Sequence, residues 1–319
     1  MEVIEVNQLK TTEKEEINMD GEKKKSYKNH FCEGENREIH HTYQPCDPSE
    51  MEDYKTIKVI YQMPLAPCKV ETVADSNTGN VYAKKTVFKE GLNDLMKALA
   101  RQECVIQSEL DHPNIIKLHK YCETEKHFEL VMDYCNNGSY FEDRLEESNE
   151  PIEDMELLKK YAKEILCALV HIHSKGILHC DIKLSNMGLH KDSEDSEEIL
   201  KLFDFNLSVY IDSEIEGKAH LEKSVGTFGY MAPELTGKDI HVGPEIDMWA
   251  LGICLYKMCV AYPPNQVRGY EYGTGPIPFV KRDWRKIDPD FQDLIKQMLE
   301  YNPENRISSA EALEHKALS

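Results

Sequence analysis

Apolar and polar residues alternate along the chain from Tyr54 onward, which is typical of β-strands with one buried face. A turn signal at Asn77-Thr-Gly79-Asn separates two of these segments and predicts a hairpin between them. Apolar residues from Leu92 to Leu110 then recur at spacings of three, four or seven, which predicts one amphipathic helix. The expected strands are residues 54–61, 69–73, 81–88, 115–121 and 127–133.

The helical period dominates after Asn136-Asn-Gly138. Apolar residues from Leu157 to Ile172 predict a long helix that stops at Gly176, because glycine is common just beyond a helix end. An acidic loop at residues 192–198 is predicted to be a solvated hairpin tip. We expect further helices at 245–262, 288–301 and 308–315, and short strands at 187–189 and 200–203. The pattern predicts a strand-rich lobe followed by a helical one.

Residues 1–53 differ from the rest because they mix acidic and basic runs with few apolar residues. Such a segment cannot bury enough surface to offset the entropy of ordering, so we expect a flexible charged extension. Histidines and cysteines between His30 and Cys46 follow no zinc-finger spacing. A disordered tail is therefore the expectation there, and a zinc site is the alternative.

The charge of the chain limits its partners. Its 319 residues include 58 acidic and 38 basic ones, for a formal net charge of −20. A surface this anionic repels phosphate backbones and acidic lipid, which argues against nucleic-acid and membrane partners. No apolar run approaches the roughly 18 residues that a membrane span needs.

The N-terminal residues, Met1-Glu-Val-Ile-Glu, have neither the basic nor the apolar region of a secretory signal. We therefore expect an intracellular protein, cytoplasmic with nuclear placement left open. The ten cysteines are expected to be free thiols in that setting.

Glu103 is the first residue with a chemical implication, because it lies on the apolar stripe of its own predicted helix. A buried carboxylate needs a partner, and Lys85 on the preceding strand is the natural candidate. The alternative is a structural ion pair with no further role.

Two loops of the helical lobe carry oxygen ligands and proton acceptors. Asp181 and Asn186 follow the long helix, and Asp204 comes about twenty residues later. If these segments converge, they supply the groups that a metal-assisted phosphoryl transfer needs. Each motif alone is weak, because an aspartate in a loop is usually a turn residue.

In their order along the chain these motifs resemble those of the protein kinase family, and the resemblance covers nearly everything from Tyr54 to the end. The motifs are Ala83-Lys-Lys85, Glu103, His179-Cys-Asp181 to Asn186, Asp204-Phe205-Asn206, Gly226-Thr227, Ala232-Pro-Glu234, Asp247-Met-Trp249-Ala-Leu-Gly252 and Asn302-Pro-Glu-Asn-Arg306. The resemblance implies a bilobal α+β protein kinase domain at residues 54–319. Its parts are a small five-stranded antiparallel N-lobe with one helix at 54–132, a hinge at 133–138 and a mainly helical C-lobe at 139–319.

The resemblance also implies a role for each matching residue. Lys85, held by Glu103, would anchor the α- and β-phosphates of ATP. Asp181 would accept the proton of the substrate hydroxyl, and Lys183 would neutralise the γ-phosphate. The magnesium ions are expected at Asn186 and Asp204. The adenine is expected near Val70, Ala83, the gatekeeper Met132, and the hinge residues Asp133 and Cys135.

The segment from Asp181 to Asn186 is similar to the serine/threonine form of the family, because Lys183 stands two residues after the aspartate. Gly226-Thr227 agrees with that form. The predicted function is thus transfer of the γ-phosphoryl group of Mg-ATP to a protein serine or threonine, by a chain taken to be a monomer. The resemblance further implies a buried Glu234–Arg306 ion pair, and an Asp247 that holds the catalytic loop by hydrogen bonds.

The phosphate-binding loop departs from the family pattern. Its three glycine positions match Met63, Leu65 and Cys68, and Pro64 and Pro67 remove N–H donors from a loop that usually wraps phosphates in backbone amides. A catalytically weak or inactive pseudokinase that acts as a binding scaffold is therefore the alternative function.

Four further departures affect regulation. Asn206 replaces a glycine, Cys180 replaces an arginine that binds a phosphate on the activation segment, and Lys223 stands where that phosphorylated residue often lies. We therefore expect a kinase that does not depend on such a phosphate, although Ser224 remains a possible site. Gln107 occupies an apolar spine position, where a polar side chain costs stability unless it is hydrogen-bonded.

Overall fold

The computed structural model describes residues 14–17, 23–26, 45–62, 67–137, 150–211, 217–236 and 238–319, with the backbone alone for 14–17, 23–26 and 238–239. The chain divides into two compact units. The first unit comprises residues 1–109 and 117–134, and the second comprises residues 110–116 and 135–319. No helix in the described ranges is long and apolar enough to cross a membrane.

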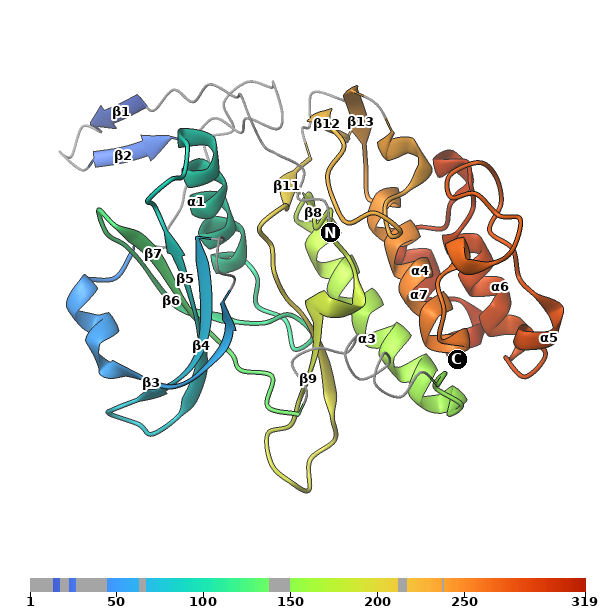
Figure 1. The fold of residues 1–319 in the computed structure, drawn as a ribbon, viewed down its shortest axis with the longest axis horizontal. Helices are drawn as coiled ribbons and strands as arrows, with labels where there is room; N and C mark the ends of the chain where they lie inside the picture. Colours follow the sequence, from blue (N-terminus) through green and yellow to red (C-terminus); the bar gives the residue numbers. More distant parts are fainter. Residues whose placement is uncertain are drawn as a thin grey trace. The chain divides into compact units, whose positions relative to one another are not determined.

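A five-stranded antiparallel sheet forms the body of the first unit, with its strands in the order β3-β4-β5-β7-β6 (Figure 1). The strands are β3 (Tyr54–Gln62), β4 (Cys68–Asp75), β5 (Val81–Phe88), β6 (Leu118–Glu123) and β7 (His127–Met132). The five predicted strands are confirmed. The fourth begins three residues later than predicted, because Ile116 instead donates its N–H to the carbonyl of Leu202 in the second unit (2.9 Å).

Helix α1 (Asp94–Ser108) packs against β6 and β7 of this sheet. Asn93 caps it, since the Asn93 side chain accepts a hydrogen bond from the N–H of Met96 (2.9 Å). Ala100 and Cys104 are buried in a cluster with sheet residues, among them Phe128. The predicted helix is confirmed, two residues shorter at each end than its apolar stripe.

The segment just before β3 is part of the packed first unit. The 3-10 helix η1 (Pro48–Asp53) begins with a capping box formed by Asp47 and Glu50. Met51 is buried against the sheet at 5% exposure, and the Cys46 N–H donates to the carbonyl of Tyr121 (2.9 Å). Packing therefore starts before the expected boundary at residue 53, and that boundary stays a prediction.

Farther toward the N-terminus, β1 (Lys14–Ile17) and β2 (Lys23–Ser26) pair as a two-stranded antiparallel sheet. Of the residues considered for zinc, those from His30 to His41 lie outside the described residues, whereas Cys46 is described.

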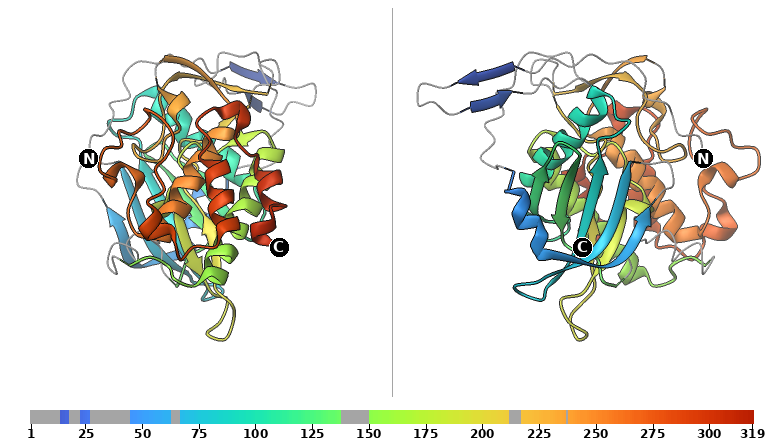
Figure 2. Two further views of the ribbon diagram at one scale, coloured as in Figure 1. Left: turned by 90° about the vertical axis from the view of Figure 1, so that its right-hand side faces the viewer. Right: turned by 60° about the vertical axis from the view of Figure 1, so that its left-hand side comes forward.

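The second unit is mainly helical, and Figure 2 shows its helices from two further sides. The helices are α3 (Met155–Ser174), α4 (Glu245–Val260), α5 (Lys281–Trp284), α6 (Pro289–Met298) and α7 (Ser309–Leu313). The 3-10 helices are η2 (Leu184–Asn186), η3 (Pro233–Leu235), η4 (Pro264–Gln266), η5 (Pro303–Asn305) and η6 (Lys316–Leu318). The antiparallel strand pairs are β8 (Ile177–Leu178) with β11 (Val209–Tyr210), β9 (Met187–His190) with β10 (Ile199–Leu202), and β12 (Ala219–Lys223) with β13 (Lys238–Val242).

Helix α4 is the centre of this unit, because it is buried on all sides, Trp249 included. α6 packs on it, and an added Cβ at Gly252 would lie 2.8 Å from the side chain of Leu299, the residue just after α6. α3 contacts both α4 and α7. The central helix also supports the loop after α3, because Asp247 on α4 accepts backbone N–H groups from that loop.

The acidic loop joins β9 to β10 as predicted (Figure 1). The last residue of this loop, Glu198, differs from the predicted solvated tip. Its carboxylate accepts a hydrogen bond from the Tyr161 hydroxyl on α3 (2.5 Å). The pairs β8/β11 and β12/β13 were not predicted, because each joins short segments that are distant in the sequence.

Replacing Met51 by alanine tests whether η1 belongs to the folded unit. Because Met51 is buried, Met51→Ala is expected to lower the free energy of unfolding by about 2 kcal/mol. Urea denaturation of the full chain measures this change, with the exposed neighbour variant Glu52→Ala as control. Equal stability of the two variants contradicts the packing of η1.

Candidate active site

Lys85 and Glu103 form an ion pair inside the first unit. The Lys85 Nζ on β5 lies 2.6 Å from the Glu103 Oε1 on α1. The two side chains are only 12% and 3% exposed, so each charge depends on the other for the solvation that burial removes. The ion pair expected from the sequence is present.

Val70, Ala83 and Met132 share one face of the sheet with Lys85. Val70 on β4 lies directly opposite Lys85, and Ala83 on β5 lies directly opposite Met132 on β7. Residues opposite one another, and residues two apart along a strand, point to the same side. The nucleotide-contact candidates of the first unit therefore gather beside the ion pair.

The two hinge candidates have structural partners of their own. Asp133 donates its N–H to the carbonyl of Lys117 (3.0 Å), and its carboxylate bonds the His119 ring at 2.7 Å. Cys135 is buried in the second unit beside Gly188, where an added Cβ would lie 2.8 Å from the Cys135 sulfur. Their adenine contacts stay predictions.

Of the positions in the expected phosphate loop, Pro67 and Cys68 are among the described residues. Met63, Pro64 and Leu65 lie outside the described residues. Pro67 is described, and its carbonyl accepts the N–H of Phe88 (2.7 Å), while Cys68 opens β4.

Asp181 is the centre of a four-residue cluster in the second unit. Its Oδ1 accepts a hydrogen bond from the Thr227 hydroxyl at 2.6 Å, and its Oδ2 lies 2.7 Å from the Lys183 Nζ. Lys183 also donates to the Thr227 hydroxyl (2.9 Å), and the Asn186 amide nitrogen donates to the Asp181 Oδ2 (3.2 Å). A hydroxyl group is thus held between a carboxylate and an ammonium group.

The backbone before Asp181 is fixed from the central helix. Both carboxylate oxygens of Asp247 accept backbone N–H groups at 2.9 Å, one from His179 and one from Cys180. The His173 ring bonds the same carboxylate at 3.0 Å. Burial alone raises the pKa of Asp247, but the hydrogen bonds from His173 and His179 outweigh it and lower that pKa. The expected role of Asp247 in holding this loop is confirmed.

Asn186 and Asp204 lie next to each other at the open end of the β9–β10 hairpin. The ladder continues one step past these strands, because the Phe203 N–H donates to the carbonyl of Asn186 (3.0 Å). Asp204 follows directly, with a φ of 68°. The described ranges hold only three non-glycine residues with positive φ, and Cys180 and Asp204 are two of them. Such strained backbone is common at functional sites.

This pair fits a magnesium ion by its donor chemistry. Mg²⁺ prefers carboxylate and amide oxygens and is usually bound through one or two protein ligands plus phosphate oxygens and water. Asp204 supplies a carboxylate, and the Asn186 amide has its nitrogen directed at Asp181. In the described part of the chain there is no group of three or more His, Cys, Asp or Glu placed to hold a metal.

Phe205 supports the turn behind Asp204. Its ring is fully buried and lies 4.8 Å from that of His179, between centroids. The His179 Nε2 bonds the carbonyl of Phe203 (3.2 Å). Burial lowers the pKa of His179, so its ring is neutral at pH 7. The two loops that carry Asp181 and Asp204 are therefore joined by a packed, uncharged contact.

The segment between Asp204 and Glu234 is anchored in the second unit. β12 pairs with β13, and the Ser224 hydroxyl donates to the carbonyl of Leu235. The Glu234 carboxylate pairs with Arg306 (2.5 Å), which also lies over the Trp249 ring. The expected Glu234–Arg306 ion pair is confirmed. The Ser224 hydroxyl is thus engaged by the backbone of η3.

Gln107 is buried at 1% exposure in the first unit. Its amide nitrogen contacts the Met132 sulfur (3.2 Å), but its Oε1 is buried with no hydrogen-bond partner among the described residues. The polar spine residue is therefore only half satisfied, which costs stability.

Comparisons with known proteins agree with this geometry. Residues 67–318 match the family described as the protein kinase domain. The chain is 33% identical over 247 residues to the calcium/calmodulin-dependent protein kinase type II subunit delta of Oryctolagus cuniculus. The aligned region covers 76% of this chain and 45% of that protein. The chain is 32% identical over 245 residues to the serine/threonine-protein kinase DCLK3 of Mus musculus (75% and 30% covered), and 31% identical over 251 residues to the calcium/calmodulin-dependent protein kinase type II alpha chain of Drosophila melanogaster (77% and 46% covered).

The chain belongs to the protein kinase family, and the predicted family and bilobal fold class are confirmed. Its relatives support the serine/threonine type. The matched region spans less than half the length of each of these relatives.

Three contributors to the site were not found from the sequence. The Thr227 hydroxyl was noted only within a motif, His173 was only one more polar position on its helix, and Gly188 carried no signal. The contacts of Thr227 with Lys183, of His173 with Asp247 and of Gly188 with Cys135 join residues at least 44 positions apart along the chain, which local patterns do not reveal.

Gln107→Leu tests the cost of the unpaired oxygen. Removing an unsatisfied buried carbonyl is expected to raise the free energy of unfolding by about 1 kcal/mol, since leaving such a group unpaired costs about 1–3 kcal/mol. Thermal and urea denaturation measure the change. Gln107→Glu is the control in the other direction, because it buries a charge at the same position and is expected to lower the free energy of unfolding. A less stable leucine variant contradicts the interpretation.

Proposed function

We propose that this chain transfers the γ-phosphoryl group of Mg-ATP to a serine or threonine hydroxyl of a protein. The observation that carries this proposal is the hydroxyl of Thr227 held at 2.6 Å from the Asp181 carboxylate and at 2.9 Å from the Lys183 ammonium group. A base that already accepts a hydrogen bond from one hydroxyl is suited to accept the proton of another. Membership of the protein kinase family supports the same reaction.

In the second unit, Asp181 accepts the proton of the attacking hydroxyl, and Lys183 offsets the negative charge of the transferring group. Asn186 and Asp204 would hold a magnesium ion, which would offset negative charge on the phosphates of ATP. Asp247 keeps Asp181 in place through the backbone N–H groups that precede it.

In the first unit, Lys85 binds the α- and β-phosphates, and Glu103 orients its ammonium group. Val70, Ala83 and Met132 form the apolar surface for adenine, and the backbone at Asp133 receives its polar edge. The backbone of Cys135, which belongs to the second unit, is proposed as a further adenine contact. The substrate is a protein rather than a nucleic acid, because the net charge of −20 disfavours a polyanion. We propose that the chain acts as an intracellular monomer.

The second candidate is a binding scaffold with weak or no catalysis. It is favoured by the glycine-free phosphate loop, in which Pro67 has no N–H to offer a phosphate. Binding of Mg-ATP without transfer distinguishes this candidate from the kinase.

Replacing the base tests the kinase directly. Asp181→Asn is expected to lower the incorporation of γ-phosphate into a basic protein substrate by about 10²-fold or more, the usual contribution of a general base. The exposed-loop variant Asp195→Asn is the matched control and is expected to keep wild-type activity. Thermal stabilisation by Mg-ATP is measured for all three proteins. Binding with no Asp181-dependent transfer supports the scaffold.

A further inference from the structure

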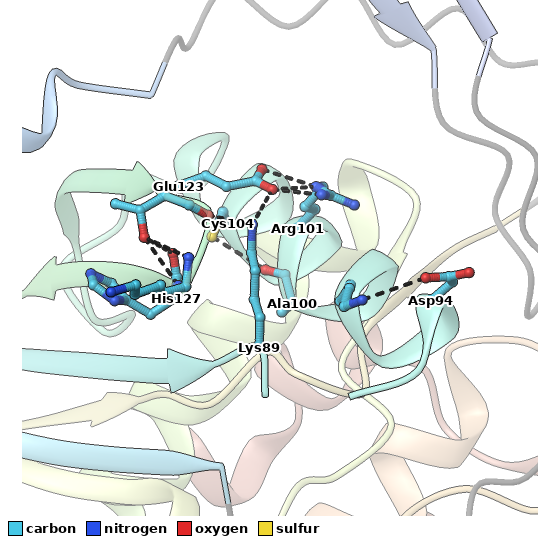
Figure 3. Close-up of polar contacts among 10 residues, drawn as sticks. Lys89, Asp94, Ala100, Arg101, Cys104, Glu123 and His127 are labelled. Carbon is cyan, nitrogen blue, oxygen red and sulfur yellow. Dashed lines mark hydrogen bonds and ion pairs between the residues drawn. The ribbon is translucent and has the colours of Figure 1, made fainter. Parts of the chain in front are cut away.

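Three charged side chains, those of Lys89, Arg101 and Glu123, meet beside α1 (Figure 3). The Arg101 guanidinium forks onto the Glu123 carboxylate, with Nε 2.9 Å from Oε2 and the terminal nitrogen 2.5 Å from Oε1. The Lys89 ammonium group also donates to the Glu123 Oε1 (2.7 Å) and to the carbonyl of Thr124 (2.6 Å). Glu123 is thus the shared acceptor of two cations.

The surroundings make this cluster stronger than a surface ion pair. The side chains of Lys89, Arg101 and Glu123 are only 13%, 19% and 24% exposed. Both cations also lie over the buried ring of Phe128, at 4.4 Å for Lys89 and 5.5 Å for Arg101. Partial burial alone raises the pKa of Glu123, but the hydrogen bonds from Arg101 and Lys89 outweigh it and lower that pKa. The carboxylate is therefore charged at pH 7.

Glu123 connects the helix to the sheet. It is the last residue of β6, and Lys89 follows directly after β5, where its N–H donates to the carbonyl of Lys126 (2.8 Å). Arg101 belongs to α1. The cluster therefore fastens α1 to the same end of two strands.

The position of Arg101 on the helix decides what this fastening does. Arg101 and Glu103 are two residues apart, so they project about 200° from each other around the helix axis. Ala100 and Cys104 lie in the buried cluster with the sheet. With one charged side chain fixed on each side of that contact, α1 cannot rotate about its axis without breaking an ion pair.

We propose that Glu123 is a positioning residue for phosphoryl transfer: through Arg101 it holds α1 at the rotation at which Glu103 reaches Lys85. The expected effect of Glu123 on activity rests on the proposed function. Its expected effect on the Lys85–Glu103 ion pair does not, because that pair forms whether or not the chain transfers phosphate. Loss of the Glu123 charge leaves two cations side by side, which drives Arg101 away and releases that side of the helix.

The test compares Glu123→Gln with Glu129→Gln in the full chain. Glu129 is a matched control, because its carboxylate pairs with Lys84 on the same sheet (3.4 Å) at 15% exposure. It alternates along β7 with Phe128 and Leu130, which pack with α1, and so it belongs to the other face of the sheet. Glu123→Gln is expected to lower kcat/KM for ATP about tenfold and to leave KM for the protein substrate unchanged, whereas Glu129→Gln changes neither.

A double variant separates positioning from a general loss of stability. If Glu123 acts through Glu103, then Glu123→Gln has no further effect on kcat/KM in a Glu103→Gln background. An equal tenfold loss in both backgrounds overturns the proposal.

A readout without ATP keeps the inference testable if the chain does not transfer phosphate. The rate at which an amine-reactive ester acylates Lys85 is measured by mass spectrometry, since an ammonium group bound to a carboxylate is shielded from the reagent. Glu123→Gln is expected to raise this rate several-fold, toward that of Glu103→Gln, while Glu129→Gln raises acylation of Lys84 only. An unchanged Lys85 rate overturns the inference, and a raised rate in a chain without transfer activity overturns the proposed function alone.

Discussion

The Asp247 carboxylate on the central helix is the constraint on which the second unit depends. It is buried inside the unit and yet charged, because two backbone N–H groups and a histidine ring replace the water it has lost. Those N–H groups belong to the residues just before Asp181, so the helix fixes the backbone on which the base lies. The left-handed backbone of Cys180 persists because this hydrogen bonding over-determines it.

The first unit follows the same principle with ion pairs. Glu103 is almost fully buried and depends on Lys85, and Glu123 depends on Arg101 and Lys89. Paired charges of this kind add little net stability, but removing one partner is costly, and so they fix geometry well. The kinase assignment requires such fixed geometry, because phosphoryl transfer is catalysed mainly by positioning and electrostatics.

Gln107 is a buried polar residue whose hydrogen-bonding groups are not all paired within the described ranges. Its nitrogen contacts a methionine sulfur, and its oxygen is left without a partner among the described residues. A buried polar group that is half satisfied destabilises the unit that contains it. The first unit thus combines two well-paired carboxylates, Glu103 on α1 and Glu123 on β6, with one half-satisfied amide, Gln107 on α1.

The sequence predicted the sheet, α1 and the long helix well, because periodicity and local signals such as Asn77–Asn80 and Gly176 act over short distances. It also anticipated the Lys85–Glu103, Asp247 and Glu234–Arg306 contacts, because the family motifs carry long-range information. It did not predict the packing of Met51, the β12–β13 pair or the Arg101–Glu123 contact, since these join distant segments that no motif connects.

The central claim is that the Asp181 carboxylate, which accepts a hydrogen bond from the Thr227 hydroxyl, acts as the base for phosphoryl transfer to a protein. The most direct measurement uses ATP whose γ-phosphate carries ¹⁸O, with mass spectrometry of the protein substrate and of the released phosphate. The account predicts labelled phosphoserine or phosphothreonine in the substrate. Label found only in free phosphate, or only in unreacted ATP, contradicts it.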